Sequence, residues 1–133
     1  MLGLLIVSHS EDAAKGIVQI AGSMGGDGVE IRGVGGNDEG GLGVSVVKIH
    51  DALSQLLQKT EGILIVPDLG SSVLSSRGAI EMLPPEEAVK VMMADAPILE
   101  GALLAAVEAS CGATLEQTAE AAQEARNMKK LGH

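Results

Sequence analysis

A histidine and an aspartate stand out because each follows an unbroken apolar stretch of the chain. His9 comes just after residues 4–7, and Asp68 comes just after residues 62–66. Apolar runs of this length, bounded by turn-forming residues, are typical of strands buried on both faces. In open α/β sheets the chemistry lies beyond the carboxyl ends of such strands. We therefore expect His9 and Asp68 to open onto one crevice.

The pair has the residue types of a histidine nucleophile. A carboxylate that accepts a hydrogen bond from one ring nitrogen fixes the tautomer and frees the other nitrogen for attack. His9 would carry a phosphoryl group, and Asp68 would orient it. The spacing alone leaves open a simpler interpretation, in which His9 is a turn residue and Asp68 caps a helix.

Helices are predicted to start beside both residues, at Ser10 and at Ser71. The first N–H groups of a helix and its dipole attract an anion such as phosphate. Glu11 and Asp12 fit the acidic first turn of the earlier helix. We predict that phosphate is bound by Ser10, Gly70 and Ser71.

Alternating apolar patterns place these residues in an α/β fold. Strands are predicted at residues 4–7, 29–32, 62–66 and 89–93, and helices at residues 11–24, 44–60, 71–83, 98–109 and 114–130. This order predicts an open, doubly wound, mainly parallel four-stranded sheet with helices on both faces. Residues 1–133 are predicted to form a single domain.

Composition limits the function further. The chain has a net charge of −9 and no Phe, Tyr or Trp, which argues against a nucleic-acid partner. The core must therefore use Leu, Ile, Val, Ala and the six Met. The single Cys111 cannot form an internal disulfide, which favours the cytoplasm, and we expect it to be a small buried hydrophobe. No apolar run is long enough for a signal peptide or membrane span.

Residues 33–43 are rich in glycine but match no nucleotide-binding motif. They lack the full dinucleotide fingerprint, and the chain has no Gly-Lys-Ser/Thr element. Two interpretations remain, a flexible connection or a loop that borders the His9 crevice and contacts phosphate or a partner through its amides. His50 lies within a predicted helix and His133 is terminal, so no metal-ligand spacing is seen. We predict no cofactor and no metal.

Four motifs occur in order along the chain. They are Ile6-Val7-Ser8-His9-Ser10, Gly41-Leu42-Gly43-Val44-Ser45, Asp68-Leu69-Gly70-Ser71 and Ala96-Pro97-Ile98-Leu99-Glu100-Gly101. Together they resemble the phosphoryl-carrier subunits of phosphotransferase-system-dependent dihydroxyacetone kinases, which belong to the mannose-type IIA superfamily. The resemblance implies a parallel α/β homodimer with a phosphohistidine at His9, hydrogen-bonded by Asp68.

The resemblance also implies partners. The donor would be the phosphorylated carrier HPr, and the acceptor would be ADP on a nucleotide-binding kinase subunit. That subunit would phosphorylate dihydroxyacetone held by a third subunit. Some members of this family carry additional fused domains.

The chain departs from its relatives at some positions. Val44 replaces a threonine that is common in the glycine-rich motif, which puts a phosphate contact from that side chain in doubt. Sugar-transporting IIA relatives tend to have Thr-His-Gly and a tryptophan after the aspartate, whereas this chain has Ser-His-Ser and Leu69. The dihydroxyacetone branch therefore fits better than the sugar-transport branch.

Three alternatives stay open. One is a sugar-transport IIA subunit. Another is a receiver-like module phosphorylated on Asp68, with Glu11 and Asp12 as its acidic pair, although the lysine that receivers need is missing. The last is a binding module of the same fold that takes up no phosphate.

Overall fold

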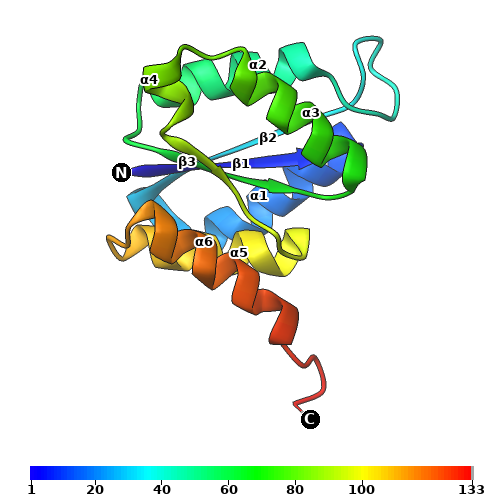
Figure 1. Cartoon of the computed structure of the whole chain (residues 1–133). Coiled ribbons are helices and arrows are strands. Elements are labelled where there is room, and N and C mark those ends of the chain that lie inside the picture. Colours follow the sequence, from blue (N-terminus) through cyan, green and yellow to red (C-terminus); the bar gives the residue numbers. More distant parts are fainter. Residues whose placement is uncertain (133) are drawn as a thin grey trace.

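The computed structural model describes residues 1–132, and His133 lies outside the described residues (Figure 1). Four parallel strands form one sheet in the order β2-β1-β3-β4. The elements in chain order are β1 (Leu2–Ser8), α1 (Glu11–Gly25), a 3₁₀ turn η1 (Gly26–Gly28), β2 (Val29–Gly35), α2 (Val46–Leu57), β3 (Ile63–Pro67), α3 (Gly70–Glu81), α4 (Pro85–Ala88), β4 (Val91–Met93), α5 (Ile98–Ser110), α6 (Leu115–Glu124) and a 3₁₀ turn η2 (Ala125–Asn127). The predicted fold class is confirmed.

Helices cover both faces of the sheet. Figure 1 shows α2, α3 and α4 on one side, and α1, α5 and α6 on the other. Side chains along a strand alternate between the two faces. Leu4 and Ile6 of β1 therefore pack toward α1 and α5, whereas Leu5 and Val7 pack toward α2 and α3. The central strands β1 and β3 are buried on both faces, as their unbroken apolar runs predict.

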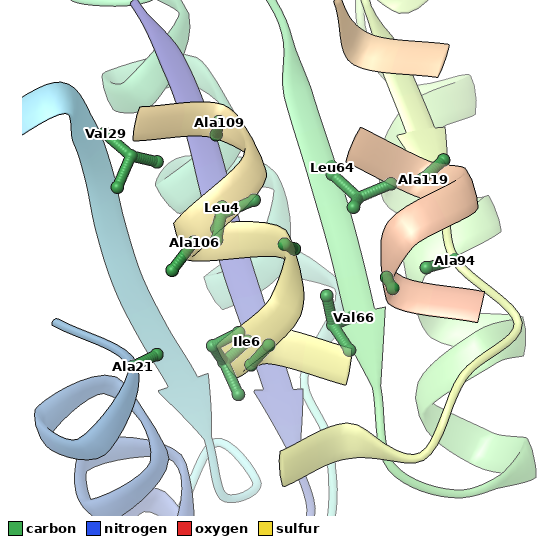
Figure 2. Close-up of a cluster of buried hydrophobic side chains, with 13 residues drawn as sticks. Leu4, Ile6, Ala21, Val29, Leu64, Val66, Ala94, Ala106, Ala109 and Ala119 are labelled. Carbon is green, nitrogen blue, oxygen red and sulfur yellow. The ribbon is translucent and has the colours of Figure 1, made fainter. Parts of the chain in front are cut away.

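The core lies close beneath α5 because the buried face of that helix is made of alanine. Ala102, Ala105, Ala106 and Ala109 are buried there, and the last two face Leu4 and Ile6 of β1 in Figure 2. Small side chains let the helix approach the sheet closely, so no aromatic ring is needed to fill a gap. The expectation that all six methionines build this core is wrong for four of them, whereas Met92 and Met93 pack against it. Met1, Met24, Met82 and Met128 are exposed, and Met92 and Met93 are only partly buried.

Several boundaries differ from the predicted ones for local reasons. α2 begins at Val46 because the Ser45 side chain caps it by accepting from the N–H of Lys48. The final helix ends at Glu124 and gives way to the short turn η2. β2 continues to Gly35, β4 begins only at Val91, and the short α4 fills the turn before β4. No helix among residues 1–132 is long and apolar enough to cross a membrane.

The expectation for Cys111 is also wrong. The residue follows the last turn of α5, where the helix leaves the core, and its side chain is exposed. An apolar neighbourhood in the sequence does not distinguish the buried face of a helix from its exposed end.

Candidate active site

The sheet brings His9 and Asp68 together at the position where the connections diverge. β1 and β3 are paired neighbours, with Val7 opposite Pro67 at their carboxyl ends. The chain then runs from β1 to α1 on one face and from β3 toward α3 on the other (Figure 1). This divergence is a topological switch point, where two loops part and leave a crevice. The N–H of Asp68 donates to the carbonyl of Val7 at 3.0 Å and fixes the loop.

Asp68 receives an unusually full set of hydrogen bonds. Its Oδ1 accepts from His9 Nδ1 at 2.9 Å, Ser72 Oγ at 2.6 Å and the Leu69 N–H at 2.6 Å. Its Oδ2 accepts from Ser8 Oγ at 2.9 Å and the His9 N–H at 3.0 Å. Both oxygens are therefore held, and the carboxylate has one orientation.

These contacts keep Asp68 ionised. Burial by itself raises the pKa of the carboxyl group, but hydrogen bonds from Ser72, from the backbone and ring of His9, and from Ser8 outweigh it. The net result is a pKa lowered from 3.8 to about 2. Donors that favour the charged form of a carboxyl group shift the equilibrium in this direction. Asp68 is therefore an anion over the whole physiological range.

An ionised Asp68 fixes the tautomer of His9. A carboxylate oxygen 2.9 Å from Nδ1 must face an N–H, because two lone pairs at this distance would repel. In the neutral ring the proton then resides on Nδ1, and Nε2 carries the free lone pair. The side chain of His9 is 28% exposed and that of Asp68 is 16% exposed. The His9 side chain is thus partly open to solvent while its partner stays mostly buried.

Two buried serines complete the network, and we did not identify either of them as a site residue from the sequence. Ser8 Oγ donates to Asp68 and accepts from the N–H of Ser10 at 3.1 Å, so it links the carboxylate to the start of α1. Ser72 lies on α3, where it is fully buried. An Asp followed four residues later by Ser, across a helix start, is the only sequence signal for Ser72.

The two helix starts differ. Ser10 caps α1 by accepting from the Ala13 N–H, its own N–H is used by Ser8, and Glu11 and Asp12 occupy the first turn. α3 has no side-chain cap and no acid in its first turn. Among residues 1–132, nothing accepts a hydrogen bond from the N–H groups of Gly70 and Ser71. The start of α3 is therefore the better anion site.

The glycine-rich segment lies beside His9 and is held in place by Asn37. The Asn37 side chain accepts from the N–H groups of Glu39 and Gly41 and donates to the Leu42 carbonyl. Lys48 Nζ donates to the Asn37 carbonyl at 2.7 Å, which ties the loop to α2. The N–H of Gly43 donates to the His9 carbonyl at 2.9 Å. Of the two interpretations, the structure favours an ordered loop that borders the crevice.

The surroundings of Val44 account for a valine in place of the threonine that is common in the glycine-rich motif. The Val44 side chain packs against the buried cluster formed by β1, β3 and α2. Gly43, directly before it, adopts a φ of +137°, a conformation that L side chains rarely adopt. The loop therefore turns at Gly43 and places the partly buried side chain of Val44 against the core.

The remaining candidates lie elsewhere or have other partners. His50 is on α2, with Nδ1 3.4 Å from Asp51 Oδ1. Glu11 pairs with Lys15 one turn along α1, and Asp12 is exposed. A receiver needs an accessible aspartate, whereas the carboxylate of Asp68 is covered by donors. In the described part of the chain, no three His, Cys, Asp or Glu residues gather to hold a metal.

Comparison with known proteins now decides the family. Residues 3–119 match the model of the mannose-type IIA family, described as the fructose IIA component of the phosphotransferase system. The chain belongs to this family. The matched region of this family member includes His9, Asp68 and both buried serines.

Relatives with assigned names are phosphoryl donor subunits, called DhaM, of phosphoenolpyruvate-dependent dihydroxyacetone kinases. The one from Providencia stuartii is 36% identical over 133 residues, which is 98% of this chain but only 28% of that protein. One from Listeria innocua is 37% identical over 108 residues, covering 81% of this chain and 86% of that protein. The chain therefore spans less than a third of the first relative and most of the second.

A solved structure supports the fold. A crystal structure of a protein of unknown function is 35% identical and superposes with a TM-score of 0.84, covering 92% of this chain and 93% of the other. The resemblance seen in the four motifs is thus confirmed at the level of the family and the fold.

Proposed function

We propose that this protein is a phosphohistidine relay that feeds a dihydroxyacetone kinase. The observation that carries the proposal is the hydrogen bond from His9 Nδ1 to an ionised Asp68, which leaves Nε2 as the nucleophile. The family match and the names of the relatives give the class of reaction. Phosphoryl transfer asks a protein mainly for positioning and charge stabilisation.

In the first step the lone pair of His9 Nε2 attacks the phosphorus of a phosphohistidine on the donor HPr. The new P–N bond forms as the donor's P–N bond breaks, and the donor ring recovers its electron pair. Phospho-His9 carries a proton on Nδ1, and the Asp68 carboxylate balances the positive charge of that ring. In the second step a phosphate oxygen of ADP attacks the phosphorus, and Nε2 recovers its electron pair.

The phosphoryl oxygens would be held at the start of α3. The N–H groups of Gly70 and Ser71 have no acceptor among residues 1–132, and they form the positive end of the α3 helix dipole. The hydroxyl of Ser71 is exposed beside them. Ser10 would contribute only its hydroxyl hydrogen, because its N–H and its hydroxyl oxygen are engaged within α1 and β1.

The partners in this proposal are HPr, the nucleotide-binding kinase subunit and the dihydroxyacetone-binding subunit. The working form would be a homodimer in the cytoplasm, and the chain would act as one phosphocarrier domain. Two leucines beside the site, Leu42 and Leu69, are 79% and 63% exposed, which suits a site that meets other proteins. The rival assignment is a sugar-transport IIA subunit, whose acceptor would be a IIB subunit.

The experiment begins with labelled phosphoenolpyruvate, enzyme I and HPr. We expect an acid-labile, base-stable label that disappears in His9→Ala, and we expect Asp68→Ala to take up label slowly while remaining folded. Ser110→Ala, far from the site, is the control variant and should label like the unaltered protein. A label that survives His9→Ala, or one that hydroxylamine removes, would contradict the relay.

Transfer from the labelled protein then separates the two branches. Addition of the nucleotide-binding and dihydroxyacetone-binding subunits with ADP should move the label to dihydroxyacetone. Transfer to a sugar-transport IIB subunit, with none to the kinase subunits, would favour the rival assignment.

A further inference from the structure

Helix α3 buries two serine side chains one turn apart. Ser72 and Ser76 are both fully buried, and they lie on the same side of the helix. Their hydroxyl groups differ in one respect. Ser72 Oγ donates to Asp68 Oδ1 at 2.6 Å, whereas Ser76 Oγ has no hydrogen-bond partner within residues 1–132. The chain thus contains a matched pair of serines, one in contact with the His9–Asp68 pair and one not.

We infer that Ser72 is a positioning residue of the relay, whose hydroxyl holds the Asp68 carboxylate in the orientation that aims His9. This inference rests on the proposed function of His9. Ser72 Oγ lies 3.3 Å from Nδ1 of the ring, on the side away from the nucleophilic Nε2. It therefore acts through Asp68 and does not meet the phosphoryl group.

The geometry explains why the carboxylate needs this hydroxyl. Ser8 and the His9 N–H hold Oδ2, on the side of β1. On the other oxygen, the Leu69 N–H belongs to the same loop as Asp68, so it moves with the aspartate. Ser72 is the donor to Oδ1 that comes from a rigid, buried element. Without it, Oδ1 keeps only donors from the two loops, so the carboxylate and the imidazole ring bonded to it would be held less firmly.

The electrostatics agree with the geometry. Burial raises the pKa of Asp68, and among the hydrogen bonds that lower it the one from Ser72 is the largest contributor. Removal of this hydroxyl should make the carboxyl group more basic. A more basic Asp68 would compete better for the Nδ1 proton, which a charged phospho-His9 needs to keep in order to release its phosphoryl group.

The test compares Ser72→Ala, Ser72→Cys and Ser76→Ala in phosphoryl uptake from phospho-HPr. We expect kcat to fall about tenfold in Ser72→Ala, the size of one hydrogen bond to a charged group. KM should stay unchanged, because Ser72 is buried away from any partner. The thiol of Ser72→Cys fills the same space but donates weakly, so it should also be slow. Ser76→Ala should match the unaltered protein.

A second measurement follows the Asp68 carboxyl group by ¹³C NMR during an acid titration. The pKa of Asp68 should rise in Ser72→Ala and stay at about 2 in Ser76→Ala. This readout needs no phosphorylation, so it still tests Ser72 if His9 takes up no label and the relay itself is wrong.

The inference is overturned by any of three results. One is an unchanged kcat in Ser72→Ala. Another is an equal loss of rate in Ser76→Ala, which would show that packing matters and the hydroxyl does not. The third is the same Asp68 titration in Ser72→Ala as in the unaltered protein.

Discussion

Replacement of Asp68 by asparagine should show how much the site carboxylate stabilises the fold. The asparagine has nearly the same shape but no charge for the surrounding donors. In the folded protein the pKa of Asp68 is about 2, against an ordinary value of 3.8. Each pKa unit corresponds to about 1.4 kcal/mol. Asp68→Asn should therefore lower the free energy of unfolding by about 2 kcal/mol at pH 7.

The pH dependence gives the sharper test. Because the folded-state pKa is depressed, the stabilisation is complete above pH 3.8 and is lost as the pH falls through about 2. The difference in the free energy of unfolding between the unaltered protein and Asp68→Asn should therefore be about 2 kcal/mol at pH 7, about 1 kcal/mol at pH 3 and close to zero near pH 2.

Urea unfolding at these pH values, followed by circular dichroism, measures this difference directly. The control is Asp27→Asn, since Asp27 is exposed and makes no hydrogen bond or ion pair within residues 1–132. The free energy of unfolding of Asp27→Asn should differ little from that of the unaltered protein at every pH. If the difference for Asp68→Asn stays constant from pH 7 to pH 2, the stabilisation comes from shape and not from ionisation, and the reasoning above is wrong.

Three further predictions follow from single contacts. In Gly35→Ala the new Cβ would lie 2.6 Å from the Ser10 carbonyl oxygen, so the free energy of unfolding in urea should fall by roughly 1–3 kcal/mol. In Gly16→Ala on α1 the new Cβ would meet nothing within 4 Å, so the free energy of unfolding should rise by up to about 1 kcal/mol. Equal effects of the two substitutions would contradict this account. Asn37→Ala removes three side-chain hydrogen bonds of the glycine-rich loop. Amide hydrogen exchange at residues 39–43 should therefore accelerate at least tenfold, which is roughly the effect of one lost hydrogen bond. Protection as in the unaltered protein would mean that Asn37 does not hold the loop. Ser76→Ala removes a buried hydroxyl that has no partner within residues 1–132, so the protein should gain about 1 kcal/mol; a lower urea midpoint would show that the hydroxyl has a favourable contact.

The sequence was sufficient for the parts of the site that depend on strand position. Apolar runs located β1 and β3, and the rule for parallel sheets placed His9 and Asp68 in one crevice. This inference needs only the order of the strands and not the direction of any side chain. The relation between the two residues was therefore predictable from a single chain.

Other features depend on the angular phase of a helix or on the path of a loop. Ser71 and Ser72 are adjacent in the sequence, yet one is exposed and the other is fully buried against Asp68. A one-residue uncertainty in the start of α3 is a rotation of about 100°, which is enough to exchange them. The ordering of residues 37–43 likewise depends on how one asparagine folds back on its own backbone, which composition does not indicate.

The two helix starts at the crevice differ in which of their backbone groups are free. The start of α1 is closed, because Ser10 caps it, the Ser10 N–H donates to Ser8, and Glu11 and Asp12 occupy its first turn. The start of α3 is open, because it lacks both a cap and an acid, while its buried face supplies the hydroxyl that holds Asp68. Of the two helices, α3 is thus the one suited to hold both the Asp68 carboxylate and, in the proposed relay, the incoming phosphate. A negative charge introduced by Ser71→Asp should therefore slow phosphoryl uptake from phospho-HPr far more than removal of the existing charge by Asp12→Asn.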